Sequence, residues 1–176
     1  KALARIAGFL KANGTVPAIQ IAHAGRKAST PVGWRHGFDE REDEKAAVAF
    51  EHWQPVGPSA LPHTQAPEYQ TPVALDAAGI RKVIDDFAAA FARAHRAGFE
   101  VAEIHAAHGY LLNQFLSNYS NKRGDAYGGS RQNRMRLLLE VTEAVRANWP
   151  ASKPLWVRLS VVDGKGGWNM EDSLAL

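Results

Sequence analysis

Two histidines and a tyrosine give the strongest chemical signal in the sequence, in the segment His105-Ala-Ala-His108-Gly109-Tyr110. At this spacing their side chains can converge on one ligand atom. A neutral imidazole donates one N–H, so two of them would stabilise negative charge developing on a carbonyl or nitro oxygen. A nearby Tyr can supply a proton.

Two alternatives to this interpretation stay open. The histidines could simply satisfy backbone groups at a strand end. A zinc site is disfavoured, because HxxH lacks the Glu of HExxH and no third ligand is evident.

Two further polar residues lie inside apolar, strand-like segments. Gln20 is part of VPAIQIA at 16–22, and Arg158 is part of LWVRLSV at 155–161. A buried Gln needs hydrogen-bond partners, which a heterocycle with alternating donors and acceptors would supply. A buried Arg needs an anion or an acceptor. The competing interpretations are a core glutamine bonded to the backbone and an ion pair between Arg158 and Glu103.

The elements that must position these residues alternate along the chain. Helical periodicity predicts helices at Lys1–Ala12, Ile80–Ala94, Met135–Trp149 and after Asn169, with a short helical stretch at Tyr110–Leu116. A buried strand is predicted at 16–22, and two further strands are predicted at 99–105 and 155–161. This alternation implies parallel strands with helical crossovers. No strand is followed by the Gly-rich turn of a doubly wound sheet, but polar residues follow all three strands. That pattern favours part of a (β/α)8 barrel.

Composition limits the function classes. The chain has 176 residues, no Cys and a net charge of +3 with scattered basic residues. We therefore expect no disulfide framework, no nucleic-acid partner and no membrane segment, and a reducing cytoplasmic location fits. The long connection at 23–71, with a charged segment at 39–45, is expected to be a functional excursion. Because both ends fall inside predicted helices, we expect a central segment that is truncated at both ends.

Three segments resemble the signature segments of old yellow enzymes, and most closely those of the bacterial xenobiotic-reductase-like ene-reductase branch. They are AHAGRKA (22–28), EIHAAHGYLLNQFLS (103–117) and SNKRGDAYGGSRQNRMR (120–136). The similarity covers nearly the whole chain and is weakest at 29–72. It implies that the three strands are about strands three to five of a single (β/α)8 TIM barrel that binds FMN.

The resemblance also implies roles for individual residues. Gln20 would hydrogen-bond the flavin pyrimidine ring, and Arg158 would lie near flavin N1 and O2, where its charge favours the reduced flavin. His105 and His108 would bind the carbonyl oxygen of the substrate, with His105 also close to the flavin, and Tyr110 would donate a proton. No metal ligand is implied. The remaining matching residues are interpreted as scaffold: Asn121, Arg123, Asp125, Tyr127, Gly128, Gly129, Asn133 and Arg134.

The implied activity is that of an NAD(P)H:flavin oxidoreductase. The enzyme would take hydride from NAD(P)H and reduce activated C=C bonds in enones or nitroalkenes by ping-pong chemistry. Its partner would be a small electrophilic alkene, and a homo-oligomer is compatible with the family. A redox-tuning Cys and the phosphate-binding loops would lie outside these residues. The alternatives are a metal-dependent barrel hydrolase that uses His105 and His108 as ligands, and a non-catalytic barrel fragment.

Overall fold

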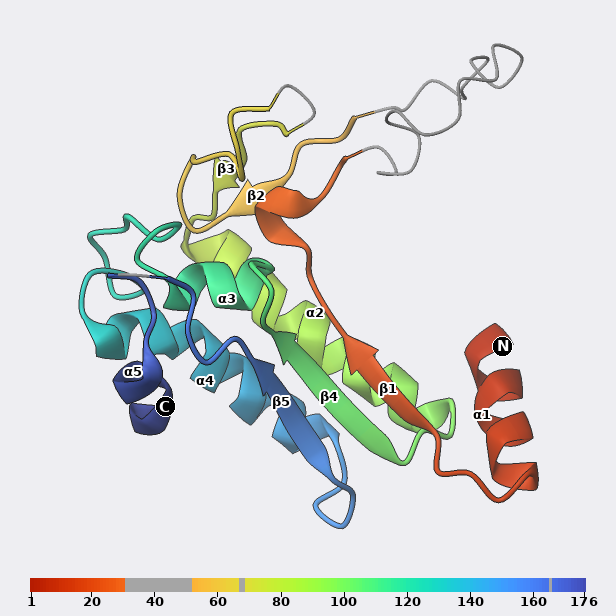
Figure 1. The fold of residues 1–176 in the computed structure, drawn as a ribbon. Helices are drawn as coiled ribbons and strands as arrows, with labels where there is room; N and C mark the ends of the chain where they lie inside the picture. The colour runs from red at the N-terminus through yellow and green to blue at the C-terminus, as the bar shows by residue number, and fades with distance from the viewer. Residues whose placement is uncertain (31–51, 67–68, 165) are drawn as a thin grey trace, which may run out of the picture.

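Three parallel strands form the sheet that carries the predicted site residues (Figure 1). They are β1 (Ala18–Ile21), β4 (Val101–Ala106) and β5 (Leu155–Leu159), in the spatial order β1-β4-β5. Each new strand therefore adds on the same side of the preceding one. A doubly wound sheet reverses this direction at its switch point, whereas a barrel keeps it. The strand order thus agrees with the barrel prediction.

The computed structural model describes residues 1–30, 52–66, 69–164 and 166–176. The predicted charged segment at 39–45 lies outside the described residues. The described parts of the long connection contain the 3-10 turn η1 (Gly25–Lys27) and the short strand β2 (Val56–Gly57), which pairs with β3 (Val73–Ala74) just after the connection. These strands were not predicted, because two residues are too few to show a period.

Two long helices cover one face of the sheet (Figure 1). They are α2 (Ala77–Arg96) and α4 (Arg131–Asn148). Asp76 and Ser130 cap their N-termini, each accepting a hydrogen bond from a backbone N–H of the first turn. The apolar stripes of these helices pack on alternate strand residues to form the core: Ile19, Ile21, Ala102, Ile104, Leu155 and Leu159.

The opposite face of the sheet is open. By strand register, Gln20 lies beside Glu103, and His105 lies beside Arg158. The prediction that the strand at 16–22 is buried was therefore wrong. Gln20 and Arg158 are exposed, and Trp156 keeps 54% of its surface accessible. The physical reason is that the helices cover one face only, and no described element packs on the other.

Three shorter helices complete the fold: α1 (Ala2–Ala12), α3 (Leu111–Leu116) and α5 (Met170–Ala175). The helix predicted after Asn169 is confirmed, and Asn169 and Asp172 form a reciprocal capping box at its start. The apolar residues Leu3 and Ile6 of α1 are not buried, since each is about half exposed. In contrast, every residue of α3 is buried, and this helix directly follows the His105–Tyr110 segment.

Candidate active site

His105 lies near the carboxyl end of β4, and its imidazole is buried. Its Nδ1 accepts the backbone N–H of Ala107 at 3.1 Å, so the ring proton must be on Nε2. Burial lowers the pKa of His105 below its ordinary value, and the neighbouring His108 and Arg158 side chains act in the same direction. The side chain is therefore a neutral donor at pH 7, as the sequence predicts for an oxygen-binding histidine.

The structure brings the three predicted ring side chains together. The ring centroids of His105 and His108 are 5.1 Å apart with the rings nearly perpendicular, and those of His105 and Tyr110 are 4.9 Å apart. His105 is buried, Tyr110 is half-buried and His108 is exposed. The structure therefore places two imidazoles and a phenol next to one another, with His108 open to solvent.

The turn that follows β4 has an unusual backbone. His108 has a φ of 58° and Gly109 a φ of 71°, and a left-handed conformation is uncommon for a residue other than Gly. Side chains from other elements hold this turn in place. The N–H of His108 donates to Ser160 Oγ at 2.9 Å, and the N–H of Gly109 donates to Asn113 Oδ1 at 2.7 Å. The strain is thus supported by hydrogen bonds, as is common at functional sites.

Lys27 belongs to the same site and was not assigned a role from the sequence. Its Nζ donates to the backbone oxygen of His108 at 2.7 Å and lies 5.9 Å from the ring centroid of Tyr110. Burial, followed by the charge of Arg26, lowers the pKa of Lys27. The only available signal was its place in AHAGRKA, a motif recognised as a block. The structure adds a cation at the end of η1 to the edge of the site.

Gln114 joins the first and second strand ends. From the buried face of α3, its Nε2 donates to the backbone oxygens of Gly109 at 2.7 Å and Ala24 at 3.2 Å. Its Oε1 accepts the N–H of Arg26 at 3.3 Å. A Cβ on Gly25 would overlap this amide, and Gly25 has a φ of 60°. The Gly of AHAGRKA is therefore required both by its backbone conformation and by this close approach.

Replacing Gln114 by Leu is expected to lower the free energy of unfolding by about 1–3 kcal/mol, because buried carbonyl groups lose their donors. Urea unfolding of the protein measures this. Gln132→Leu on the exposed side of α4 is the matched control and should change stability by less than about 0.5 kcal/mol. Equal effects of the two substitutions would contradict the role of Gln114.

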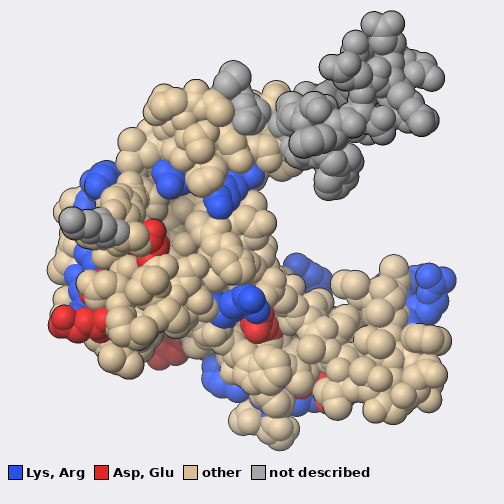
Figure 2. Space-filling model, viewed as in Figure 1, with Lys and Arg blue, Asp and Glu red and all other residues tan. Residues whose placement is uncertain are grey.

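The open face of the sheet carries the other predicted residues. Strands β4 and β5 contain one charged residue each, Glu103 and Arg158, and Figure 2 shows an acidic group next to a basic group over these strands. The alternative of an ion pair between the two is not supported within the described part of the chain, where Glu103 accepts from Gln20 Nε2 instead. Arg158 has no hydrogen-bond or ion-pair partner among the described residues.

The signature loop, residues 118–130, is held by its own side chains. Asn121 donates to the backbone oxygens of Phe115 and Tyr127 at 2.8 and 2.7 Å. Arg123 donates to the oxygens of Pro58 and Leu75 at 2.9 and 2.6 Å. It also holds the pKa of the Asp125 carboxyl below its ordinary range by hydrogen bonding. These contacts agree with the scaffold interpretation.

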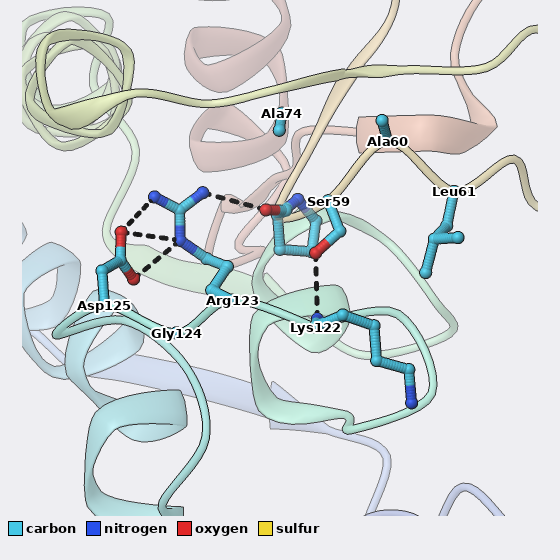
Figure 3. Close-up of a pocket in the computed structure, with 9 residues that line it drawn as sticks. Ser59, Ala60, Leu61, Ala74, Lys122, Arg123, Gly124 and Asp125 are labelled. Carbon is cyan, nitrogen blue, oxygen red and sulfur yellow. Dashed lines mark hydrogen bonds and ion pairs between the residues drawn. The ribbon is translucent and has the colours of Figure 1, made fainter.

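A surface cleft of about 450 Å³ lies between this loop and the segment before β3 (Figure 3). Lys122 and Ser59 line it, and the backbone N–H of Lys122 donates to Ser59 Oγ at 2.9 Å. Most of the hydrogen bonds there join the lining residues to one another. We therefore interpret the cleft as a contact between two loops and not as a ligand site.

Within the described residues, no group of three or more His, Cys, Asp or Glu side chains is arranged to hold a metal ion. Among the helices of the same residues, none combines the length and the apolar character needed to cross a membrane.

The sequence and the fold were compared with those of known proteins, and both match flavin oxidoreductases. The model of the NADH:flavin oxidoreductase / NADH oxidase family matches residues 1–173. The chain is 44% identical over 158 residues to an NADPH dehydrogenase of Clostridium acetobutylicum, covering 90% of this chain and 40% of that protein. It resembles the structure of morphinone reductase in complex with tetrahydroNAD, with a TM-score of 0.76, 31% identity and coverage of 97% of this chain and 46% of that one.

The structure of the old yellow enzyme homologue from Zymomonas mobilis is also similar, with a TM-score of 0.70, 33% identity and coverage of 90% of this chain and 41% of that one. The fold is thus part of the (β/α)8 barrel of flavin oxidoreductases. The chain belongs to the NADH:flavin oxidoreductase / NADH oxidase family, the old yellow enzyme family. FMN and NAD(P)H are the cofactors that this family implies. The chain spans about 40% of the length of the NADPH dehydrogenase.

Proposed function

We propose that residues 1–176 are the central segment, about strands three to five, of one FMN-binding barrel domain that reduces activated C=C bonds with hydride from NAD(P)H. The observation that carries the proposal is the neutral His105, whose free Nε2–H lies among His108 and Tyr110 at the carboxyl end of β4. Catalytic groups of barrel enzymes lie at this end of the strands. Enones and nitroalkenes are the proposed substrates, reduced by ping-pong chemistry.

The side chains of the open face fit FMN. Gln20 offers an amide, and Arg158 offers a guanidinium that binds no described residue. The pyrimidine part of a flavin alternates carbonyl acceptors with an N–H donor, so it suits an amide and a cation on the same face of the sheet. The barrel neighbour morphinone reductase binds tetrahydroNAD, which supports a nicotinamide nucleotide as the source of hydride. FMN, when bound, supplies the hydride transfer itself.

The protein side chains act on the substrate. Nε2–H of His105 and the exposed ring of His108 donate to the substrate's carbonyl or nitro oxygen, where negative charge develops as hydride arrives at the β-carbon. Tyr110 delivers a proton to the α-carbon. Lys27 donates a hydrogen bond to the backbone oxygen of His108 and lies over the Tyr110 ring. It therefore fixes the positions of His108 and Tyr110 relative to each other.

The direct test is a visible absorption spectrum of the complete barrel protein, followed by NADPH reduction and reoxidation with cyclohexenone. A flavin spectrum that bleaches with NADPH and returns with the enone is the expected result. Bound zinc without flavin would overturn the proposal in favour of the hydrolase alternative. Bound FMN without turnover of any activated alkene would overturn the substrate assignment alone.

Arg158→Ala is expected to lower the reduction potential of the bound flavin, because the positive charge of Arg158 favours the reduced cofactor. Equilibration with a reference dye measures the potential. Arg81→Ala, on the exposed side of α2, is the matched loss of one Arg and should leave the potential unchanged. An unchanged potential in the Arg158 variant with FMN still bound would remove Arg158 from this role.

A further inference from the structure

Glu103 is a carboxylate on the open face of the sheet that the proposed reaction does not use. It lies beside Gln20 in the parallel register of β1 and β4, and its Oε1 accepts the Nε2–H of Gln20. It has no ion pair with Arg158 or any other described residue. The Glu103 carboxylate therefore binds a neutral amide, although a guanidinium without a described partner lies on the next strand. This pairing is unusual.

The carboxylate of Glu103 determines which end of the Gln20 amide faces it. An ionised carboxylate only accepts hydrogen bonds, whereas a carboxamide has one donor end and one acceptor end. The amide of Gln20 must therefore turn its NH2 towards Glu103. Its Oε1 then faces away from β4 and is free to accept, and one N–H of Nε2 remains to donate. An amide without such a neighbour can present either end, because the two orientations have nearly the same shape.

This orientation matters for a flavin. The pyrimidine edge carries an N–H donor flanked by carbonyl acceptors. A Gln amide matches it only when its oxygen meets the N–H, because the flipped amide would set donor against donor. We propose that Glu103 is a positioning residue that fixes the orientation of the Gln20 amide for flavin recognition. This inference rests on the proposed FMN-dependent function.

The test compares two substitutions of similar size in the complete barrel protein. Glu103→Met removes the acceptor, whereas Glu103→Gln keeps an oxygen that can accept from Gln20. FMN dissociation constants are measured by quenching of flavin fluorescence on titration of the apoprotein. We expect FMN binding about 10-fold weaker in E103M, which is about the value of one hydrogen bond, and within about 2-fold of wild type in E103Q. Glu143→Met on the exposed side of α4 is the control and should bind FMN like the wild type.

A double-mutant cycle with Gln20→Ala separates positioning from packing. If Glu103 acts through Gln20, the double variant E103M/Q20A should bind FMN no more weakly than Q20A alone. Additive losses, or equal weakening by E103M and E103Q, would overturn the inference while leaving the proposed function in place. Failure of the wild-type protein to bind FMN would overturn both. If E103M does not fold, Glu103→Ala takes its place, because it also removes the acceptor and the same loss of FMN affinity is expected.

Discussion

Replacing both His105 and His108 by Ala in the complete barrel protein is expected to slow enone reduction about 10²–10³-fold. In the proposed reaction the two imidazoles would donate to the oxygen on which negative charge develops, and loss of one such donor costs about 2.7–4 kcal/mol in comparable sites. The lowered pKa of His105 strengthens this expectation, because the ring stays a neutral donor. Stopped-flow reoxidation of the reduced flavin by cyclohexenone measures the rate.

Phenol binding gives an independent measure of the same variant. A phenolate resembles the enolate that forms on the substrate, so phenols should give a long-wavelength charge-transfer band with oxidised flavin in the wild type and none in the double variant. His95→Ala is the control. His95 lies on α2 and packs against Trp149, with ring centroids 5.7 Å apart. Tight phenol binding that survives in the double variant would show that the oxygen is bound elsewhere.

Tyr110→Phe is expected to slow only one half-reaction. The centroid of the phenol ring lies 4.9 Å from that of the His105 ring. In the proposed reaction the phenol would deliver the proton that the enolate needs after hydride transfer. No proton is required from Tyr110 when NADPH reduces the flavin. Reoxidation by cyclohexenone should therefore slow about 10²-fold or more, while flavin reduction stays nearly unchanged.

Nitroalkenes provide the internal comparison for the Tyr110 variant. Their nitronate products are stable enough to leave and take up a proton in water, so their reduction should slow less than that of enones. Tyr127→Phe is the matched control, because its hydroxyl donates to Glu140 at 2.9 Å within the scaffold. Equal slowing of both half-reactions in Tyr110→Phe, or of neither, would contradict the assignment.

The sequence predicted the order of the main elements and the grouping of His105, His108 and Tyr110. Both depend on local patterns: the apolar stripes of α2 and α4 repeat with the helical period, and side chains within one turn cannot separate far. Gln20 and Arg158 lie on one face because their register partners on β4, Glu103 and His105, are two residues apart.

The sequence did not predict features that depend on contacts between distant segments. Lys27 reaches the backbone of His108 across 81 positions, and Gln20 meets Glu103 across 83. The pairing of Glu103 with Gln20, rather than with Arg158, is decided by strand register and not by charge. The open face of the sheet was also missed, because apolar strand residues look alike whether helices cover one face or two.

The turn after β4 is held from several directions. The N–H groups of His108, Gly109 and Leu111 donate to Ser160, to Asn113 and to the backbone of His23, so the carboxyl ends of all three strands and α3 restrain it. Such a turn gives up its conformational entropy when the chain folds rather than when a substrate arrives. Binding then needs to order the substrate alone, and the free energy of each hydrogen bond to the substrate oxygen remains available to favour the reaction.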